Sequence, residues 1–500
     1  MGSHRRTASG RALSCALVFV VASALALAAC GGSTPPGADS PKAGDRGAAK
    51  KAMPSPKPEY LSNDKRARRK PAGPAPETGD LGAWLDLEDP SGHALDAFHA
   101  RLAATAQGEG KTRLLFFGAS HVASDLFTRI VRSDLQREFG DGGRGWVLPV
   151  HAWRYYRPLG LSLESNGRRW KSRFVKISKP EPDFYGLAGV YMESTRAGDH
   201  GALTTHASAT AADFELHYLA QPRGGDVDVF LDGKRLSRLR TKGAAKGVSS
   251  ATFAVPAGEH RFEVRTVGNG PVRLFGVEME GEEPGVVVDA LGVNGARAKN
   301  QLWWDDASFR AELAKRDPAL VALAYGTNES GDDDVPIETY EGEVRRVLAR
   351  VKEAAPGASC LLIGPSDRPL VARDGTATHR PRTDLVIETQ RRISKDMGCA
   401  FVDMAGYMGG PLSILTWASH DPPLAAKDHI HLTVKGYERF GHALSAALLR
   451  GTDGIAHAHP ATGTARRPAN DEAANDEAAN DEDGDVLDHD IAPGDPLEAE

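Results

Sequence analysis

Short apolar runs alternate with amphipathic stretches in two separate parts of the chain. The run at 112–117 is followed by an amphipathic stretch near 124–139, and the alternation returns at about residue 284. Strands that alternate with helices predict a parallel sheet covered by helices on both faces. One of the helices is expected at 300–316, NQLWWDDASFRAELAKR. Five strands are expected, and they read LLFF, GVVVDALG, ALVALAYG, CLLIGPSD and CAFVDM.

The intervening residues have another pattern, in which apolar and polar positions alternate one by one. Stretches such as DFELHYLA and DVDVFLDGKRL show this period of two, and Asp-Gly and Ala-Gly turn signals separate them. The pattern predicts a sandwich of short antiparallel strands. We therefore expect an α/β domain formed by residues 79–160 and 284–453, interrupted by an inserted β-sandwich at 161–283.

Both ends of the chain have compositions that do not predict a folded core. Residues 31–78 are rich in Pro, Gly, Ala and Lys, which is typical of a disordered linker. Residues 454–500 contain an acidic repeat without an apolar face, which indicates a solvated tail. The whole chain has a net charge of -6, from 61 basic and 67 acidic residues, and so gives no electrostatic case for nucleic-acid binding.

Residues 1–30 have the pattern of a secretory signal. Arginines precede the apolar run CALVFVVASALALAAC, which is short, rich in alanine and ends in small residues. Its ending, LAAC, resembles the bacterial lipobox, and this resemblance implies that Cys30 is lipidated. An ordinary signal peptide with a chance cysteine is the alternative. Gly31, not aspartate, follows the cysteine, and by resemblance to other lipoproteins this favours the outer membrane over the inner one. The expected location is therefore the cell envelope, anchored on the periplasmic side.

Two groups of residues allow two interpretations each. Cys360 and Cys399 each begin an expected strand in an oxidising compartment, so a disulfide and two buried free thiols are both consistent with the pattern. The aromatic residues Trp153, Tyr155 and Tyr156 fit a sugar-stacking surface and fit packing between two domains equally well. The oligomeric state is not predicted by any feature of the sequence.

Polar residues follow several of the expected parallel strands. Ser120 comes after the first strand in GASHVA, Gly295 after the next in GVNGARA, and Asn328 after the third in YGTNES. Asp428 and His431 lie in a long loop just before the final helix. Ligands of open α/β sheets bind beyond the carboxyl ends of the strands, so these residues are the expected site.

The residue types fit acyl transfer. A serine hydroxyl is a weak nucleophile that needs an adjacent base, and His431 is the expected base for Ser120. Asp428 is expected to orient the imidazole and to stabilise its charged form. The backbone N–H groups of Ser120 and Gly295 and the side-chain amide of Asn328 are the expected oxyanion donors.

These residues, in this order, resemble the four sequence blocks of the SGNH (GDSL-type) hydrolases. The resemblance implies the flavodoxin-like three-layer fold with a five-stranded parallel sheet. The α/β-hydrolase alternative requires a second glycine after the serine, which GASHVA lacks. One departure is Ala119, where the family usually has aspartate, so the serine turn is expected to be looser. Asp125 is nearby, but it is not expected to substitute for the missing aspartate.

An SGNH domain interrupted by a β-sandwich resembles the peptidoglycan O-acetylesterases, which carry a carbohydrate-binding-like module there. The resemblance implies a serine esterase that removes O-acetyl groups from a cell-envelope polysaccharide, with peptidoglycan as the expected substrate. A polysaccharide O-acetyltransferase on the same fold and a non-catalytic glycan-binding lipoprotein are the alternatives. No cofactor is expected. Metal binding is not expected either, because the spacing of the acids and histidines in SHDPPLAAKDHIH matches no helix-borne metal motif.

Overall fold

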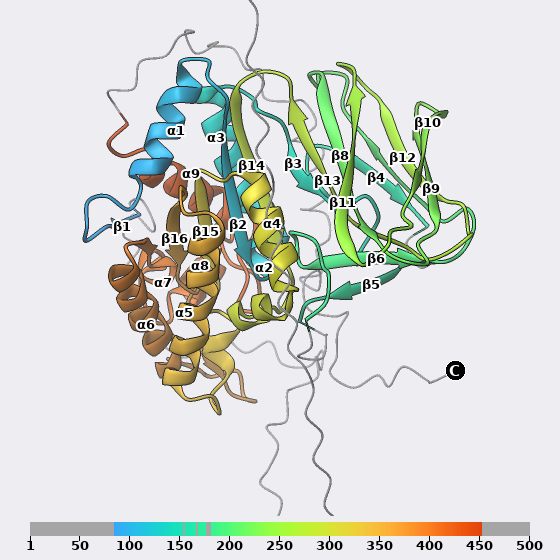
Figure 1. Ribbon diagram of the computed structural model, residues 1–500. Coiled ribbons are helices and arrows are strands. Elements are labelled where there is room, and N and C mark those ends of the chain that lie inside the picture. Colours follow the sequence, from blue (N-terminus) through green and yellow to red (C-terminus); the bar gives the residue numbers. More distant parts are fainter. Residues whose placement is uncertain (1–84, 154–155, 167–168, 177–181, 453–500) are drawn as a thin grey trace, which may run out of the picture. The chain divides into compact units, whose positions relative to one another are not determined.

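The computed structural model describes residues 85–153, 156–166, 169–176 and 182–452 (Figure 1). The expected signal segment and lipidation site at 1–30, the linker at 31–78 and the acidic tail at 454–500 lie outside these residues. Within the described part of the chain, none of the helices has the length and apolar character needed to cross a membrane.

The central sheet has six strands in the order β1-β19-β16-β15-β2-β14. All neighbouring pairs are parallel except β1 with β19, which is antiparallel. The sheet is therefore mixed, whereas the sequence pattern predicted only parallel strands. The edge strand β1 is two residues long, too short to show a period of two. The strands are β1 Leu87–Glu88, β2 Lys111–Gly118, β14 Gly285–Gly292, β15 Leu320–Ala324, β16 Ser359–Ile363 and β19 Ala400–Val402.

Helices cover both faces of this sheet, so the fold has three layers (Figure 1). Strand β2 shows how, because its successive side chains point to opposite faces. Leu114 and Phe116 pack with α1, α3 and α9, whereas Leu115 and Phe117 belong to the cluster that includes α4, α5 and α6. The helices are α1 Asp96–Ala106, α2 Ser120–Ala123, α3 Leu126–Phe139, α4 Asp306–Arg316, α5 Ile337–Ala354, α6 Pro381–Met397, α7 Met404–Met408, α8 Ser413–Ser419 and α9 Val434–Leu448, with 3₁₀ helices at Ala298–Trp303 and Glu329–Gly331.

The helix expected at 300–316 is divided in two. A 3₁₀ helix ends at Trp303, and α4 begins at Asp306. The side chain of Asp305 accepts a hydrogen bond from the Ser308 N–H at 2.9 Å, which is the geometry of an N-terminal cap. Trp304 donates its indole N–H to the carbonyl of Gly186 at 2.8 Å. The interruption between the two helices is thus fixed by the Asp305 cap and by the hydrogen bond from Trp304 to Gly186. The apolar pattern alone does not show this contact between residues distant in sequence.

The residues before β14 also form two antiparallel sheets, ordered β10-β9-β12-β7-β4 and β11-β8-β13-β6-β5. Phe262 of the first sheet packs against Phe214 and Phe253 of the second, with ring centroids 5.3 and 5.7 Å apart. The strands are β4 Ser162–Ser165, β5 Lys171–Phe174, β6 Val190–Ser194, β7 His200–Thr204, β8 Ala212–Ala220, β9 Asp226–Leu231, β10 Lys234–Arg240, β11 Gly247–Val255, β12 Arg261–Thr266 and β13 Val272–Gly281. A short hairpin elsewhere pairs β17 Leu370–Val371 with β18 Ala377–Thr378.

The two antiparallel sheets are not separated from the α/β part at the boundaries that the sequence pattern predicted. Strand β3, Gly145–Val147, lies before the expected boundary at residue 161 and pairs with β13. A single cluster of buried apolar side chains joins residues of both parts, including Phe117 and Phe275. A strand of three residues gives no periodic signal, and shared packing is invisible in a sequence. The interpretation as an inserted sandwich domain with boundaries at 161 and 283 stays a prediction.

Cys360 and Cys399 form a disulfide bond. Cys360 lies in β16, and Cys399 immediately precedes β19, the parallel neighbour of β16. Of the two alternatives that the sequence left open, the structure therefore has the cross-link. The bond closes a loop over a sequence separation of 39 residues, which restricts the unfolded chain and so favours the folded state.

Candidate active site

The serine turn connects β2 to the short helix α2, which begins at Ser120. The carbonyl of Ala119 accepts hydrogen bonds from the N–H groups of Val122 and Ala123, at 3.2 and 2.9 Å. A Cβ atom at Gly118 would lie 2.4 Å from Val122 Cγ2, so the turn requires glycine there. The turn is thus held by backbone bonds and close packing that need no carboxylate at position 119.

Asp125 has another role than support of the serine turn. Its backbone is left-handed, with φ of 55°, directly before α3. The buried carboxylate contacts Arg132 at 3.1 Å and Arg144 at 2.5 Å, and Thr128 donates a hydroxyl to it at 2.7 Å. Asp125 therefore fixes the glycine-rich loop that carries Arg144 against α3. The expectation that Asp125 does not replace the missing family aspartate agrees with these contacts.

The structure brings Ser120, His431 and Asp428 into one hydrogen-bonded chain. Ser120 Oγ lies 2.8 Å from His431 Nε2, and His431 Nδ1 lies 2.6 Å from Asp428 Oδ2. The loop before α9 places the pair, because Asp428 Oδ1 also accepts the backbone N–H groups of Ile430 and His431 at 2.9 and 3.0 Å. With Nδ1–H donated to the carboxylate, Nε2 is free to accept the serine proton.

Asp428 is held in its ionised form. Burial raises the pKa of its carboxyl, but the hydrogen bond and charge of His431 and two backbone N–H groups lower it further, so the net pKa is below its ordinary value. A carboxylate that stays ionised can stabilise an imidazolium at Nδ1 throughout the neutral pH range. His429, next to this pair, has left-handed backbone with φ of 56° and is half-buried.

A second histidine, His121, lies next to His431, and the sequence analysis gave it no role. Its ring centroid is 5.5 Å from that of His431. Its Nδ1 lies 2.7 Å from the Tyr437 hydroxyl and its Nε2 lies 3.2 Å from Ser366 Oγ. Burial, together with repulsion by His431, lowers the pKa of His121 to about 3. The only sequence signal was its position beside Ser120, which does not distinguish a buried histidine from an exposed one.

His121 gives a prediction for stability against pH. Because its folded-state pKa is depressed, the neutral ring stabilises the fold above the unfolded-state pKa of 6.5, and this contribution is lost as the pH falls toward 3. The loss is about 3 kcal/mol at pH 4, on the scale of about 1.4 kcal/mol per pH unit. We expect denaturant unfolding of His121→Asn to show a correspondingly weaker decline between pH 7 and pH 4. His93→Asn, at an exposed histidine, should decline like the wild type; equal slopes in all three proteins would contradict the prediction.

The expected oxyanion donors lie at adjacent strand ends. Strand β2 is flanked by β14 and β15, which precede Gly295 and Asn328. The Asn328 amide donates to the carbonyl of Ala296 at 2.9 Å, so the two donor loops contact each other. Gly295 has φ of 70°, in the region that favours glycine. A Cβ atom there would lie 2.9 Å from Lys176 Nζ, so a side chain that follows β5 reaches this loop.

Glu329 is a further residue that the sequence analysis missed. Its two carboxyl oxygens accept the backbone N–H groups of Ala298, at 2.8 Å, and Gly326, at 3.0 Å. Burial raises its pKa despite these hydrogen bonds. The side chain therefore links the segment that follows Gly295 to the segment that precedes Asn328. The available signal was an ionisable residue directly after Asn328, at the end of an apolar strand.

We expect Glu329→Gln to lower kcat on an aryl acetate by about 10- to 100-fold, with a smaller change in KM. Glutamine keeps one acceptor and turns an amide N–H₂ toward the other backbone N–H, which displaces one donor loop, and an oxyanion donor is worth about 10²–10³ in rate. Steady-state kinetics will measure the change. Glu388→Gln, at an exposed position on α6, is the matched control; equal kcat values for the two variants would rule out this role for Glu329.

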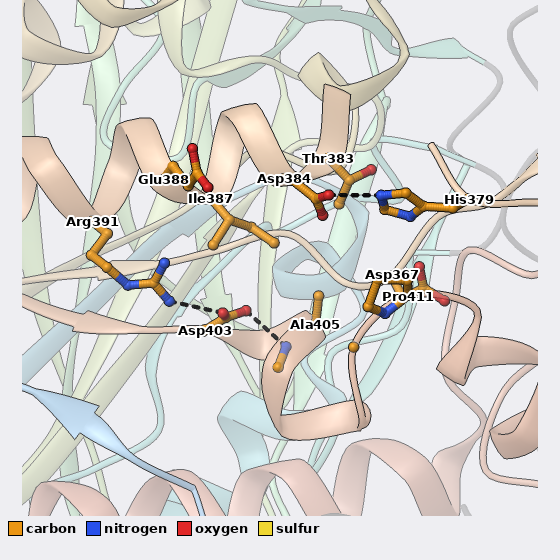
Figure 2. A pocket seen from close by; sticks show the side chains of 12 residues that line it. Asp367, His379, Thr383, Asp384, Ile387, Glu388, Arg391, Asp403, Ala405 and Pro411 are labelled. Carbon is orange, nitrogen blue, oxygen red and sulfur yellow. Dashed lines mark hydrogen bonds and ion pairs between the residues drawn. The ribbon is translucent and has the colours of Figure 1, made fainter. Parts of the chain in front are cut away.

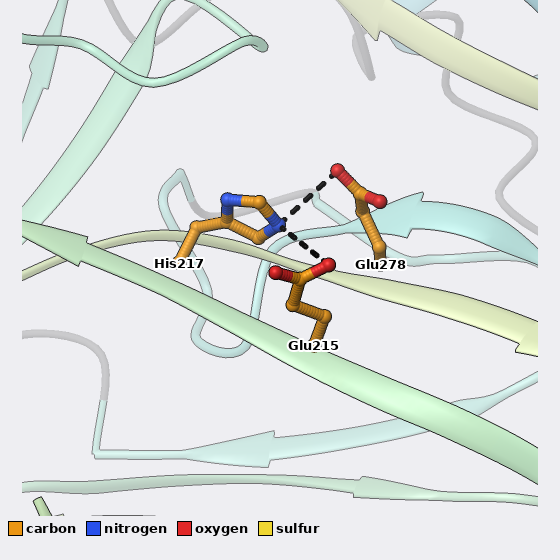
Figure 3. Close-up of side chains that lie close together, drawn as sticks. All are labelled: Glu215, His217 and Glu278. Atoms are coloured by element: carbon orange, nitrogen blue, oxygen red, sulfur yellow. Dashed lines mark ion pairs between the residues drawn. The ribbon is translucent and has the colours of Figure 1, made fainter. Parts of the chain in front are cut away.

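Two further groups of polar side chains do not include any of the expected catalytic residues. A pocket beyond the ends of β16 and β19 contains Arg391 paired with Asp403 at 2.9 Å and His379 paired with Asp384 at 2.7 Å (Figure 2). Among the described residues, the group that could hold a metal ion consists of Glu215 and His217 on β8 and Glu278 on β13 (Figure 3). None of the expected catalytic residues lines the pocket in Figure 2.

The aromatic cluster is partly explained by packing. The Tyr156 hydroxyl accepts the backbone N–H of Leu148 at 2.8 Å, and burial raises its pKa to about 12. Trp153 lies against Tyr156 and Phe174, with ring centroids 4.8 and 5.9 Å apart. The packing interpretation therefore holds for Tyr156, whereas Tyr155 lies outside the described residues.

Comparison with known proteins defines the class. Residues 262–439 match the model of the GDSL-like lipase/acylhydrolase family. This segment includes Gly295, Asn328, Asp428 and His431 but not Ser120. No curated protein matches the chain. The chain therefore contains a GDSL-like acylhydrolase domain and is an esterase, which argues against the alternative of a non-catalytic glycan-binding protein.

A solved structure of a peptidoglycan O-acetylesterase is similar over most of the chain. It has 27% identity and a TM-score of 0.62, and the match covers 73% of this chain and 99% of that one. A family two carbohydrate esterase from Clostridium thermocellum, in complex with cellohexaose, matches at 12% identity over 58% of this chain and 98% of that one. Its TM-score is 0.26. The first likeness, together with the family match, supports the SGNH-hydrolase fold.

Proposed function

We propose that the protein is a serine esterase that removes O-acetyl groups from a cell-envelope polysaccharide, with peptidoglycan as the substrate. The hydrogen-bonded chain of Ser120, His431 and Asp428 carries this proposal. Likeness to a solved peptidoglycan O-acetylesterase supports the choice of substrate. The proposed reaction uses side chains and backbone N–H groups of this chain, together with water.

In the proposed first step, Ser120 Oγ attacks the acetyl carbonyl carbon while His431 Nε2 takes the hydroxyl proton. The tetrahedral intermediate collapses, the sugar oxygen leaves with the proton from His431, and an acetyl-serine remains. Water then attacks this ester with His431 again as the base, the bond to Ser120 Oγ breaks as His431 returns the proton to that oxygen, and acetate leaves. Asp428 contributes by holding Nδ1–H and by stabilising the imidazolium in each step.

The negative charge of each intermediate develops on the former carbonyl oxygen. We infer that the N–H groups of Ser120 and Gly295 and the second N–H of the Asn328 amide bind this oxygen. The Asn328 amide donates one hydrogen to Ala296, which orients the group and leaves its other hydrogen for the substrate. Donors that are fixed before the reaction stabilise the developing charge without reorganisation.

The decisive experiment compares acetate release from O-acetylated peptidoglycan with release from acetylated xylan and from an aryl acetate. We expect release from all three to depend on Ser120, with the highest kcat/KM on peptidoglycan. Adding an acceptor sugar tests the transferase alternative, because transfer would diminish free acetate and yield acetylated acceptor. A higher kcat/KM on xylan would contradict peptidoglycan as the substrate. Absence of acetate release from all three substrates would contradict the proposed esterase activity.

We also propose that Cys30 carries a lipid anchor that places the enzyme on the periplasmic side of the envelope, in the outer membrane. The basic start, the apolar run and the LAAC ending support this proposal. Cys30→Ala should move the protein from the membrane fraction to the soluble fraction with unchanged activity on an aryl acetate. A variant that still sediments with membranes would contradict the anchor.

A further inference from the structure

Three potential metal ligands gather on one face of the antiparallel sheet that contains β8 and β13. Glu215 and His217 are two residues apart on β8, so their side chains leave the same face of the strand. Glu278 on β13 is the direct antiparallel partner of Glu215. Figure 3 shows both carboxylates turned toward the His217 ring. Like charges directly opposite each other destabilise a sheet, so cations near the two carboxylates stabilise this arrangement.

The donor atoms are close enough for one ion. His217 Nε2 lies 3.1 Å from Glu278 Oε1 and 4.0 Å from Glu215 Oε2. All three donor atoms lie within 4.8 Å of one another. The imidazole is 4% exposed, against 12% for Glu278 and 21% for Glu215, so the histidine forms the floor of the group and Glu215 its outer side. A zinc ion about 2.1 Å from each donor needs only a small inward movement of the more exposed Glu215.

Two cations of α4 orient the carboxylates. Lys315 Nζ contacts Glu215 Oε1, and Arg316 Nη1 lies 3.2 Å from Glu278 Oε2. Each carboxylate thus has one oxygen held by a cation and presents its other oxygen to His217. Outer contacts of this kind orient metal ligands in known sites. They also connect the ligand group to α4, which packs against the central sheet.

One buried polar atom of the ligand group, and another on the neighbouring helix α4, have no hydrogen-bond partner. His217 Nε2 makes no hydrogen bond of acceptable geometry, although Glu278 is near it. Oε1 of Glu312, a buried residue of α4 on which the charge of Glu278 acts, also has no partner. Buried polar atoms are usually satisfied in folded proteins, and a cation bound at His217 Nε2 would satisfy this atom.

We propose that Glu215, His217 and Glu278 bind a divalent zinc-type cation, with water as the remaining ligand. One imidazole nitrogen and two carboxylate oxygens fit Zn²⁺, whereas Mg²⁺ and Ca²⁺ prefer oxygen ligands throughout. The cation joins β8 to β13 and, through Lys315 and Arg316, fixes this sheet against α4. Its role is structural, and it does not depend on the proposed esterase function.

Metal binding to the purified full-length protein tests the proposal. After chelation and dialysis, the wild type should take up one equivalent of Zn²⁺, measured by elemental analysis and calorimetric titration, and its Tm should rise by several degrees. Mg²⁺ and Ca²⁺ at the same concentration should leave the Tm unchanged. The proposal would be overturned if the wild type took up no more zinc than a control protein without this ligand group. It would also be overturned if Mg²⁺ raised the Tm as much as Zn²⁺ does.

Variants locate the site. Glu215→Gln, at the most exposed ligand, should weaken zinc affinity at least tenfold while the fold persists, and His217→Asn should weaken it further. Glu193→Gln is the matched control, because Glu193 on the same sheet pairs with Arg273 at 3.1 Å and lies outside the ligand group. Should Glu215→Gln bind zinc as tightly as Glu193→Gln, the ion occupies another place and the proposal falls.

Discussion

Replacing Ser120 with alanine is expected to lower kcat on an aryl acetate by about 10⁶-fold, the order of loss found when a serine nucleophile is removed. Ser120 Oγ is the hydroxyl that His431 Nε2 contacts, at 2.8 Å, so the variant lacks the attacking oxygen of the proposed reaction. The side chain fills little core volume, and the turn is held by the carbonyl of Ala119, so the fold should persist. Loss of turnover should therefore come without a large change in Tm.

Two measurements should change together in Ser120→Ala. Acetate release should fall, and covalent labelling by a fluorophosphonate probe should disappear, because both reactions use the same oxygen. Ser419→Ala is a matched control, since the Ser419 hydroxyl donates within α8 to the carbonyl of Thr416. The control should label and turn over normally. Wild-type acetate release by Ser120→Ala would show that the strand-end serine is only a turn residue.

The sequence predicted the candidate site better than its surroundings, for a physical reason. Ser120, Gly295 and Asn328 each follow an apolar strand, and a parallel sheet places the ends of its strands along one edge. Asp428 and His431 are three residues apart in one loop, so their contact is local. The predicted groups could thus be found from local spacing and strand order, and the geometry agrees with that expectation.

The residues that support the site could not be found in this way. His121 contacts Tyr437 and Ser366, which are 316 and 245 residues away. Glu329 links two loops through backbone N–H groups, and a sequence does not show which N–H groups lack a partner. Both side chains are buried ionisable groups, and burial is a property of the packed chain. Single-sequence patterns identify the groups proposed to react more readily than the groups that position them.

The fold shows the same limit. The strands of the central sheet with a clear apolar run were predicted, whereas β1 and β3 are too short to give a period. Ala119 is a more instructive case, because the resemblance to SGNH hydrolases predicted a looser turn. The structure has two backbone hydrogen bonds to the Ala119 carbonyl and a glycine packed against Val122, so local order does not depend on the missing aspartate.

Asp428→Asn is expected to lower kcat by about 10²- to 10⁴-fold, less than the loss in Ser120→Ala, with little change in KM. Asparagine can still accept the backbone N–H groups of Ile430 and His431 at Oδ1. Its amide, however, donates where Asp428 Oδ2 accepted the His431 Nδ1–H at 2.6 Å. The imidazole then carries its proton on Nε2 and cannot accept the serine proton.

The pH dependence of kcat separates this tautomer effect from simple loss of charge. The pKa of Asp428 is below its ordinary value, so the wild-type carboxylate stays ionised at neutral pH. The asparagine of the variant does not titrate, so raising the pH should not restore its kcat. Asp403→Asn is the matched control, because Asp403 also accepts a backbone N–H, from Gly406 at 2.8 Å, and binds Arg391. Its kcat should stay within about threefold of the wild type. If Asp428→Asn behaves like Asp403→Asn between pH 6 and 9, Asp428 does not orient the base, and the proposed chain reduces to Ser120 and His431.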